Sequence, residues 1–194
     1  MKRPRLDIPV LLAALLILAS CGGPRYAAVD VPEREPGVLP DVELGVDLVE
    51  SNDGAFRIRK PADWVAEQST AESRVAIVDP LTGSTIRLAP LQMNQALYDA
   101  LERGGLSALT HLSMTIRTSS NNGQIEQQPF RYHLGPDPCA EYSYTVRNSG
   151  VWIRVLLIQQ EHGFYECTLA LPEGTARKAF MEVQQSVAAS LATE

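Results

Sequence analysis

The residues of this chain that could carry chemistry are three cysteines and three histidines. They are Cys21, Cys139, Cys167, His111, His133 and His162. A metal site needs such ligands at short, regular spacings, and the chain contains neither H-x-x-x-H nor C-x-x-C. It also lacks a G-x-S-x-G nucleophile elbow and a glycine-rich phosphate loop. We therefore predict a protein that is not an enzyme and that holds no metal or cofactor.

Cys21 has the most informative sequence context of the three cysteines. A basic start at residues 2–5 precedes an apolar run of 12 residues, Ile8 to Ala19, and the small residues Ala19 and Ser20 stand directly before the cysteine. A membrane-spanning helix needs roughly 20 apolar residues. The pattern therefore favours a signal peptide over residues 1–20 rather than a permanent membrane helix.

Together with Cys21, this leader resembles the lipobox of bacterial lipoproteins. The resemblance implies that the Cys21 thiol receives a diacylglyceryl group, that the chain is cut before Cys21 and that the new amine is acylated. Each buried CH₂ contributes roughly 0.8 kcal/mol, so two or more chains anchor a protein stably on a membrane. Gly22 gives no acidic retention signal, which favours the outer membrane if the source has two. An ordinary signal peptide with a chance cysteine is the alternative.

Residues 21–41 are rich in glycine and proline and show almost no apolar period. We expect the lipidated cysteine and a flexible tether here, followed by one folded domain over residues 42–194. Deleting residues 26–38 should then leave the melting temperature unchanged. Because the leader carries three basic residues and one acidic residue, its removal takes the formal net charge from −6 to −8. Such a charge argues against nucleic acid and anionic lipid surfaces as partners.

Strand and helix periods alternate along residues 42–194. Period-2 patterns predict strands at Leu44–Leu48, at Phe56–Ile58 and in the pair around 75–78 and 85–88. A helical period follows from an Asn94 N-cap to Leu112, interrupted by Gly104-Gly105. A loop is expected at 119–123. The end of the chain predicts a three-stranded meander and then a helix that begins after Thr175. The order of elements predicts an α+β fold, with one antiparallel sheet flanked by helices.

Cys139 and Cys167 fall on the outer strands of the predicted meander. An exported protein with two remaining cysteines favours a disulfide between them. With the strand between them at the usual spacing, however, their Cα atoms would lie about 12 Å apart, too far for the 4.4–6.8 Å that a disulfide requires. The sequence leaves this possible disulfide open.

A family resemblance rests on the run Phe56-Arg57-Ile58-Arg59-Lys60-Pro61-Ala62-Asp63-Trp64. It resembles the opening strand, proline and tryptophan of PsbP-like and DcrB-like domains, and the resemblance extends over residues 44–192 to the meander and the last helix. It implies an α/β/α sandwich and non-enzymatic work, because the family includes lipoproteins and assembly factors that bind other proteins.

We therefore expect a lipid-anchored, exported protein of the cell envelope that docks to, or helps to assemble, another envelope protein. The alternative is a lipoprotein that binds a small ligand between sheet and helices, and an envelope hydrolase is a third possibility. A docking protein should expose an apolar or tyrosine-lined patch. Tyr142 and Tyr144 share a strand face and are candidates, but packing of these rings beneath a helix is the favoured interpretation. A ligand-binding protein should instead have a closed cavity with a few polar groups turned inward.

Overall fold

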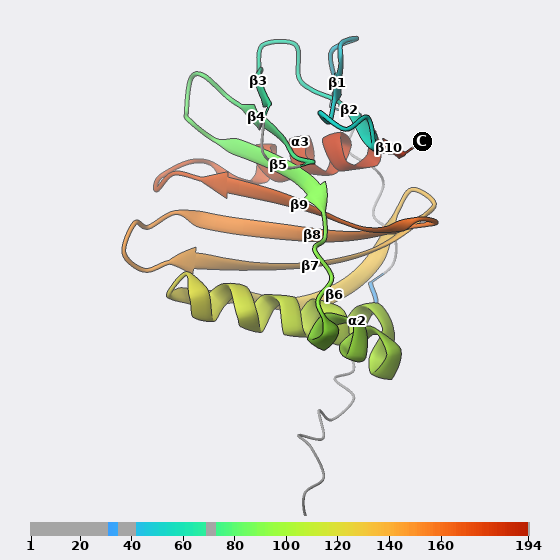
Figure 1. Cartoon of the computed structure of the whole chain (residues 1–194). Coiled ribbons are helices and arrows are strands. Elements are labelled where there is room, and N and C mark those ends of the chain that lie inside the picture. Colours follow the sequence, from blue (N-terminus) through green and yellow to red (C-terminus); the bar gives the residue numbers. More distant parts are fainter. Residues whose placement is uncertain (1–30, 35–41, 69–72, 194) are drawn as a thin grey trace, which may run out of the picture.

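The structure, a computed structural model, describes residues 31–34, 42–68 and 73–193. The predicted signal peptide and Cys21 lie outside these residues. Two helices and ten strands follow one another along the described chain (Figure 1). Their bounds are β1 Leu48–Glu50, β2 Phe56–Arg59, β3 Val65–Gln68, β4 Val75–Val78, β5 Thr85–Pro90, α2 Gln95–Ser120, β6 Gly123–Leu134, β7 Asp137–Val146, β8 Trp152–Gln160, β9 Gly163–Leu171, α3 Arg177–Ala189 and β10 Ala192–Thr193. In the described part, neither helix is long and apolar enough to cross a bilayer.

A seven-stranded antiparallel sheet forms the centre of the fold, with the strand order β3-β4-β5-β9-β8-β7-β6. Helices α2 and α3 pack on its opposite faces (Figure 1). This arrangement confirms the predicted α+β class with an antiparallel sheet flanked by helices. A small second sheet, β1-β2-β10, joins the end of the chain to the first strands beside α3.

The two faces of the sheet carry separate apolar cores. The core on the α3 side extends across the whole sheet and includes Phe56, Ile77, Leu88 and Leu169. The core on the α2 side is smaller and lies over β7 and β8, where Tyr142 and Leu157 are buried. Strands β4 and β5 bury only one face each. Their alternate residues Val75 and Ile77, and Ile86 and Leu88, are buried in the core on the α3 side.

Helix α2 begins and bends as the sequence predicts. The Asn94 side chain accepts a hydrogen bond from the Leu97 N–H at 3.0 Å. At Gly105 the backbone takes φ +59° and ψ −152°, a conformation that is essentially restricted to glycine. The helix then continues to Ser120, beyond the predicted loop start, and β6 follows directly. Strand β6 escaped prediction because its register with β7 shifts twice, between Ile125 and Phe130.

Two predicted boundaries are wrong. Strand β1 runs from Leu48 to Glu50, and within it Val49 is buried while Leu48 is exposed. The predicted alternation therefore has the opposite phase at this strand, because the chain bends at Val46, just before β1 begins. Thr175 does not cap α3, since the cap position is Ala176 and no side chain bonds there.

The predicted tether is also wrong in part. Val31 is buried, the Arg34 N–H donates to the Arg131 carbonyl at 2.7 Å, and the Arg131 N–H donates to the Pro32 carbonyl at 2.8 Å. The Arg34 guanidinium lies 3.8 Å from the centre of the Phe130 ring. Residues 31–34 thus pair with the outer edge of β6 through two backbone hydrogen bonds and bury the Val31 side chain.

Candidate functional site

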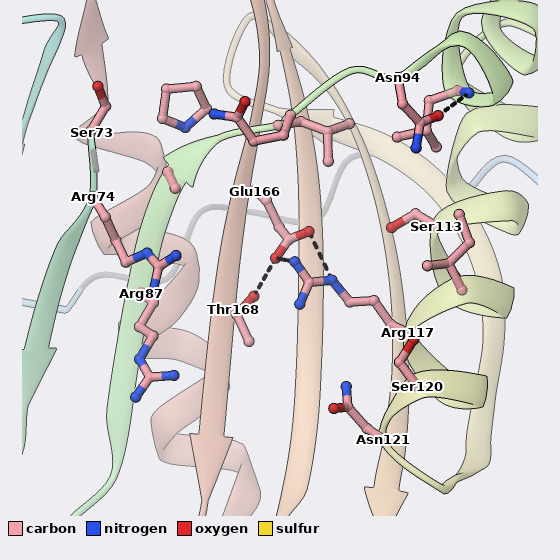
Figure 2. Close-up of a pocket in the computed structure, with 16 residues that line it drawn as sticks. Ser73, Arg74, Arg87, Asn94, Ser113, Arg117, Ser120, Asn121, Glu166 and Thr168 are labelled. Atoms are coloured by element: carbon pink, nitrogen blue, oxygen red, sulfur yellow. Dashed lines mark hydrogen bonds and ion pairs between the residues drawn. The ribbon is translucent and has the colours of Figure 1, made fainter. Parts of the chain in front are cut away.

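An open groove lies where α2 leaves part of the sheet uncovered. Helix α2 packs on β6 and β7, and the same face of β5 and β9 borders a cavity of about 490 Å³ (Figure 2). This volume falls within the range of small-molecule sites. We call it the arginine groove. Its lining residues are Ser73, Arg74, Arg87, Ala89, Pro90, Leu91, Gln92, Asn94, Leu97, Ser113, Ile116, Arg117, Ser120, Asn121, Glu166 and Thr168.

The floor of the arginine groove comes from the strand period of β5 and β9. Arg87 alternates with the buried residues Ile86 and Leu88, so its side chain leaves the opposite face of the sheet. On β9, Glu166 and Thr168 flank Cys167 in the same way. Arg87 pairs directly with Thr168 in the antiparallel register. Two neighbouring strands thus place charged and hydroxyl side chains on one surface.

The wall of the arginine groove comes from the helical period of α2. Four of its lining residues are spaced i, i+3, i+4 and i+7 and therefore share one helix face. They are Ser113, Ile116, Arg117 and Ser120. Three of these residues offer hydrogen-bond donors, and Ile116 adds an apolar contact.

Arg117 and Glu166 form an ion pair between wall and floor. The Arg117 Nε donates to Glu166 Oε2 at 3.1 Å, and Nη2 bonds the other carboxylate oxygen. Thr168 Oγ1 donates to Glu166 Oε1 at 2.9 Å. Burial alone would lower the pKa of the Arg117 guanidinium, but the charge and hydrogen bonds of Glu166 raise that pKa overall. The pair fixes Arg117 at the groove while its side chain remains 41 % exposed.

The charge of the arginine groove is opposite to that of the protein. Its lining carries three arginines and one glutamate, whereas the whole chain has a formal net charge of −6. Arg74 and Arg87 extend from one side and Arg117 from the other (Figure 2). Arg87 makes no side-chain hydrogen bond or ion pair with the described part of the chain. The groove is therefore suited to an anionic group.

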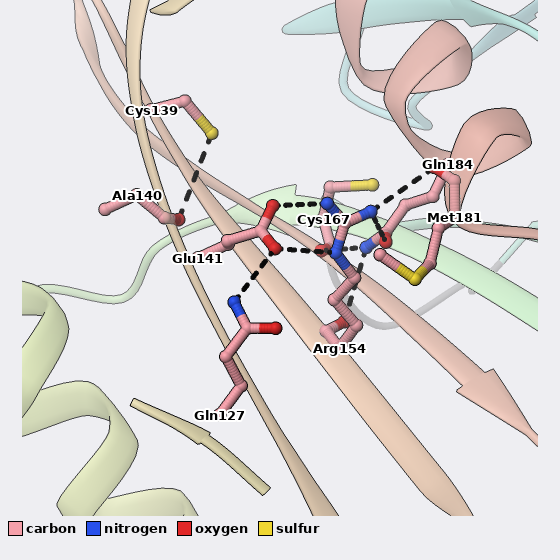
Figure 3. Close-up of polar contacts among 8 residues, drawn as sticks. All are labelled: Gln127, Cys139, Ala140, Glu141, Arg154, Cys167, Met181 and Gln184. Atoms are coloured by element: carbon pink, nitrogen blue, oxygen red, sulfur yellow. Dashed lines mark hydrogen bonds and ion pairs between the residues drawn. The ribbon is translucent and has the colours of Figure 1, made fainter. Parts of the chain in front are cut away.

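A second arginine–glutamate pair lies on the α3 side and is sealed from solvent (Figure 3). Arg154 Nε donates to Glu141 Oε1 at 3.2 Å, and its Nη2 bonds the other carboxylate oxygen. Arg154 Nη1 also donates to Gln184 Oε1 at 3.2 Å and to the Met181 carbonyl at 3.3 Å. Both charged side chains are at most 3 % exposed. No solute can reach this pair without local opening.

The two cysteines of the possible disulfide are free, buried thiols. Cys139 pairs with Ile158 and Cys167 pairs with Leu156, so strand β8 separates the two cysteines as the meander predicts. Burial raises the pKa of each thiol to about 12. Both are therefore protonated near neutral pH and unsuited to nucleophilic chemistry.

The tyrosines considered for a docking surface are covered by α2. The Tyr142 hydroxyl lies 3.1 Å from the Ser113 hydroxyl, and the Asn121 amide donates to the Tyr144 hydroxyl at 3.1 Å. Both rings are buried, so they pack beneath the helix and are not an exposed stripe. The exposed large apolar side chains, such as Val46, Leu81 and Tyr98, lie on separate elements.

None of the three histidines lines the arginine groove. His111 is on α2, His133 is on β6, and His162 is in the turn between β8 and β9. Within the described ranges, no three histidine, cysteine or acidic side chains are grouped as they would be around a metal ion.

Sequence reasoning missed the arginine groove entirely. Its residues come from the segment just before β4, from β5 and the loop after it, from α2 and from β9, which are separated in the chain. The one available signal is the single arginine between the apolar residues of β5, since a strand that buries one face shows its solvent side at alternate positions. The partner strand of β5 could not be read from that pattern.

Comparisons with known proteins bear on the fold. No protein-family model and no curated protein match the chain. The Ran-binding protein Mog1p of Saccharomyces cerevisiae has a similar structure, with a TM-score of 0.51 at 13 % identity over 78 % of this chain and 96 % of that one. This chain thus shares the PsbP-like α/β fold of Mog1p.

Two further solved structures are more distant. One is LpqN of Mycobacterium tuberculosis, involved in cell envelope biogenesis, with a TM-score of 0.42 at 13 % identity over 79 % of this chain and 94 % of that one. The other is a protein of Bacteroides thetaiotaomicron, with a TM-score of 0.45 at 14 % identity over 76 % of this chain. This chain spans 48 % of the length of that protein.

Proposed function

We propose that this protein is an exported, lipid-anchored lipoprotein of the cell envelope that works by binding a ligand in the arginine groove rather than by catalysis. The anchor and the location rest on the leader and Cys21. The binding role rests on one observation, a cavity of about 490 Å³ with polar and charged side chains turned into it. The ligand-binding alternative predicts inward-facing polar groups in a closed cavity; the arginine groove has such groups but is open to solvent.

Docking to an envelope protein remains the second candidate, and a separate observation favours it. Strand β3 lies at one end of the sheet order and pairs, in the described part, with β4. Its Val65 side chain is exposed. An extended segment of a partner could add to this edge by backbone hydrogen bonds. The opposite edge, β6, pairs with residues 31–34 of the chain itself.

The lipid anchor is tested by metabolic labelling with a fatty-acid analogue. The wild-type chain should take up the label, and the Cys21→Ser variant should not, because a hydroxyl cannot replace the thiol as lipid acceptor. Cys139 and Cys167 remain in that variant and serve as internal controls. Label that persists in Cys21→Ser would contradict the anchor.

The binding role is tested with a photoreactive amino acid placed in the full chain in intact cells. At position 116, which lines the groove, we expect an adduct with the mass of a small molecule. At position 65, on the β3 edge, a protein adduct would favour docking instead. Position 46 is exposed on a different element and is the matched control. Equal labelling at 46 and 116 would contradict a groove ligand.

A further inference from the structure

We infer that the ligand of the arginine groove is an amphiphile with a phosphate monoester head: the phosphate lies among Arg74, Arg87 and Arg117, and the apolar part lies against Leu91 and Leu97. This inference rests on the proposed function, because it names the chemistry of the ligand that the groove takes.

The charge of the lining points to a dianion. Three arginines and one glutamate leave a formal charge of +2 at the groove, and a phosphate monoester carries a charge close to −2 at neutral pH. The remainder of the chain is acidic and repels anions that are not held by specific contacts. A concave site of one sign focuses the field on a ligand of the opposite sign.

The directions of the arginines favour phosphate over carboxylate. Arg74 precedes β4, Arg87 is on β5 and Arg117 is on α2, so the three side chains come from two sides of the groove (Figure 2). A carboxylate has two oxygens in one plane and is satisfied by one guanidinium fork. A phosphate monoester presents three terminal oxygens in three directions and can accept from several forks.

Glu166 positions Arg117 for this role. Its two oxygens accept from Arg117 Nε and Nη2, and Thr168 adds a third bond. The Nη1 group of Arg117 makes no such bond with Glu166. Glu166 therefore holds the guanidinium plane, while Nη1 remains available to a ligand oxygen.

Neutral donors and an apolar end complete the site. The side chains of Ser120 and Asn121 line the groove at the C-terminal end of α2. Pro90, Leu91 and Leu97 line it near the start of α2. A ligand that spans the groove thus meets charge in the middle and apolar surface at one end. This combination selects an amphiphile over inorganic phosphate.

A phosphate monoester of this kind could be the head of a membrane lipid or a free metabolite. Calorimetry on the full-length, lipid-modified chain in phosphatidylcholine nanodiscs tests the shared chemistry. The probes are phenyl phosphate, inorganic phosphate and phenyl glucoside, which has the same ring and no charge. We expect phenyl phosphate to bind at least roughly tenfold more tightly than either of the others.

Variants of Arg87 assign the binding to the groove. Arg87→Ala should weaken phenyl phosphate binding by roughly tenfold or more, and Arg87→Lys should restore only part of the affinity because it lacks the planar fork. The matched control is Arg57→Ala, on an exposed position of β2 beside α3. Thermal unfolding of each variant checks that it is folded. Equal losses in Arg57→Ala and Arg87→Ala would overturn the inference.

The two sources are separated by the lipid of the nanodisc. If adding phosphatidic acid weakens phenyl phosphate binding and adding phosphatidylglycerol does not, the head of a membrane lipid occupies the groove. If neither lipid weakens it, the ligand is a soluble phosphate ester. Phenyl glucoside binding as tightly as phenyl phosphate would overturn the phosphate inference and leave the proposed function standing. The proposed function itself fails if no small-molecule adduct forms at position 116.

Discussion

The two faces of the central sheet each carry one bidentate arginine–glutamate pair, and the two pairs differ in how far the arginine is exposed. On the α3 side, Arg154 and Glu141 are buried and further bonded by Gln184. On the α2 side, Arg117 is 41 % exposed and its pair with Glu166 borders an open groove. We call Arg154–Glu141 the closed pair, on the closed face, because both side chains are buried. Arg117–Glu166 is the open pair, because Arg117 is exposed at the groove.

Burial has this effect because a charge loses its hydration when it leaves water. A buried pair must satisfy all its donors and acceptors within the protein, as Arg154 does with Glu141, Gln184 and the Met181 carbonyl. In the second pair the Glu166 side chain is also only 9 % exposed, and Arg117, at 41 %, is the partner that keeps its contact with water at the groove. Only an arginine that contacts water, as Arg117 does, can exchange that water for a ligand.

The closed face should make its two thiols, Cys139 and Cys167, slow to react with alkylating reagents. Cys139 and Cys167 have pKa values of about 12 in the fold, against about 9 when exposed, so at pH 8 the thiolate fraction falls about a thousandfold on folding. Alkylation with iodoacetamide should be slow in the native protein and fast in urea. Rapid native labelling of either cysteine would mean that this face opens.

The same shift predicts how stability depends on pH. The thiols stay protonated in the fold, whereas those of the unfolded chain ionise above about pH 9. Ionisation therefore stabilises the unfolded state as pH rises. Their contribution to stability is complete below pH 9 and is lost progressively up to about pH 12. Chemical denaturation across this range measures the loss. A Cys139→Ala variant should lose less between pH 9 and 12.

Removing one partner of the closed pair should cost the most stability of any single change here. Glu141→Ala leaves the Arg154 charge buried without its counter-ion and should lower the free energy of unfolding by about 3–5 kcal/mol. Urea denaturation measures the change. The double variant Glu141→Leu/Arg154→Met removes both charges and should recover most of the loss. No recovery in the double variant would show that packing, rather than charge, is responsible.

Residues 31–34 extend the closed region to the edge of β6. Val31 is 2 % exposed, so Val31→Asp should lower the free energy of unfolding by at least about 1.5–3 kcal/mol, the value of burying such a side chain. Deleting residues 26–38 should lower the melting temperature for the same reason. Val46→Asp, at a site 90 % exposed, is the control and should change little. Equal free energies of unfolding for the wild type and Val31→Asp would instead support a flexible tether over these residues.

Breaking the open pair should cost less stability than breaking the closed pair. Arg117→Ala leaves the Glu166 carboxylate, which is 9 % exposed, beside a groove that water can enter, and should cost about 1–3 kcal/mol in urea denaturation. The ratio between this loss and that of Glu141→Ala measures the difference between the two faces. A loss in Arg117→Ala as large as that in Glu141→Ala would contradict an open groove, because water that enters the groove should hydrate the Glu166 carboxylate.

The elements with regular periods could be predicted from the sequence, and the groove could not. The meander from Cys139 to Leu171 and the Asn94 cap follow local rules of alternation and hydrogen bonding. Strand β6 escaped because two register shifts break its period. The groove depends on Arg87 and Thr168 meeting across the β5–β9 pair. That pairing joins strands separated by more than seventy residues, which no local pattern records.

The most direct test of the open and closed faces is to follow the arginine Nε–Hε signals by NMR while phenyl phosphate is added to the full-length chain in phosphatidylcholine nanodiscs. The signals of Arg87 and Arg117 should move together with one binding constant, and that of Arg154 should stay in place. An unmoved Arg87 signal, or an Arg154 signal that moves as far as the other two, would contradict a ligand held in the arginine groove.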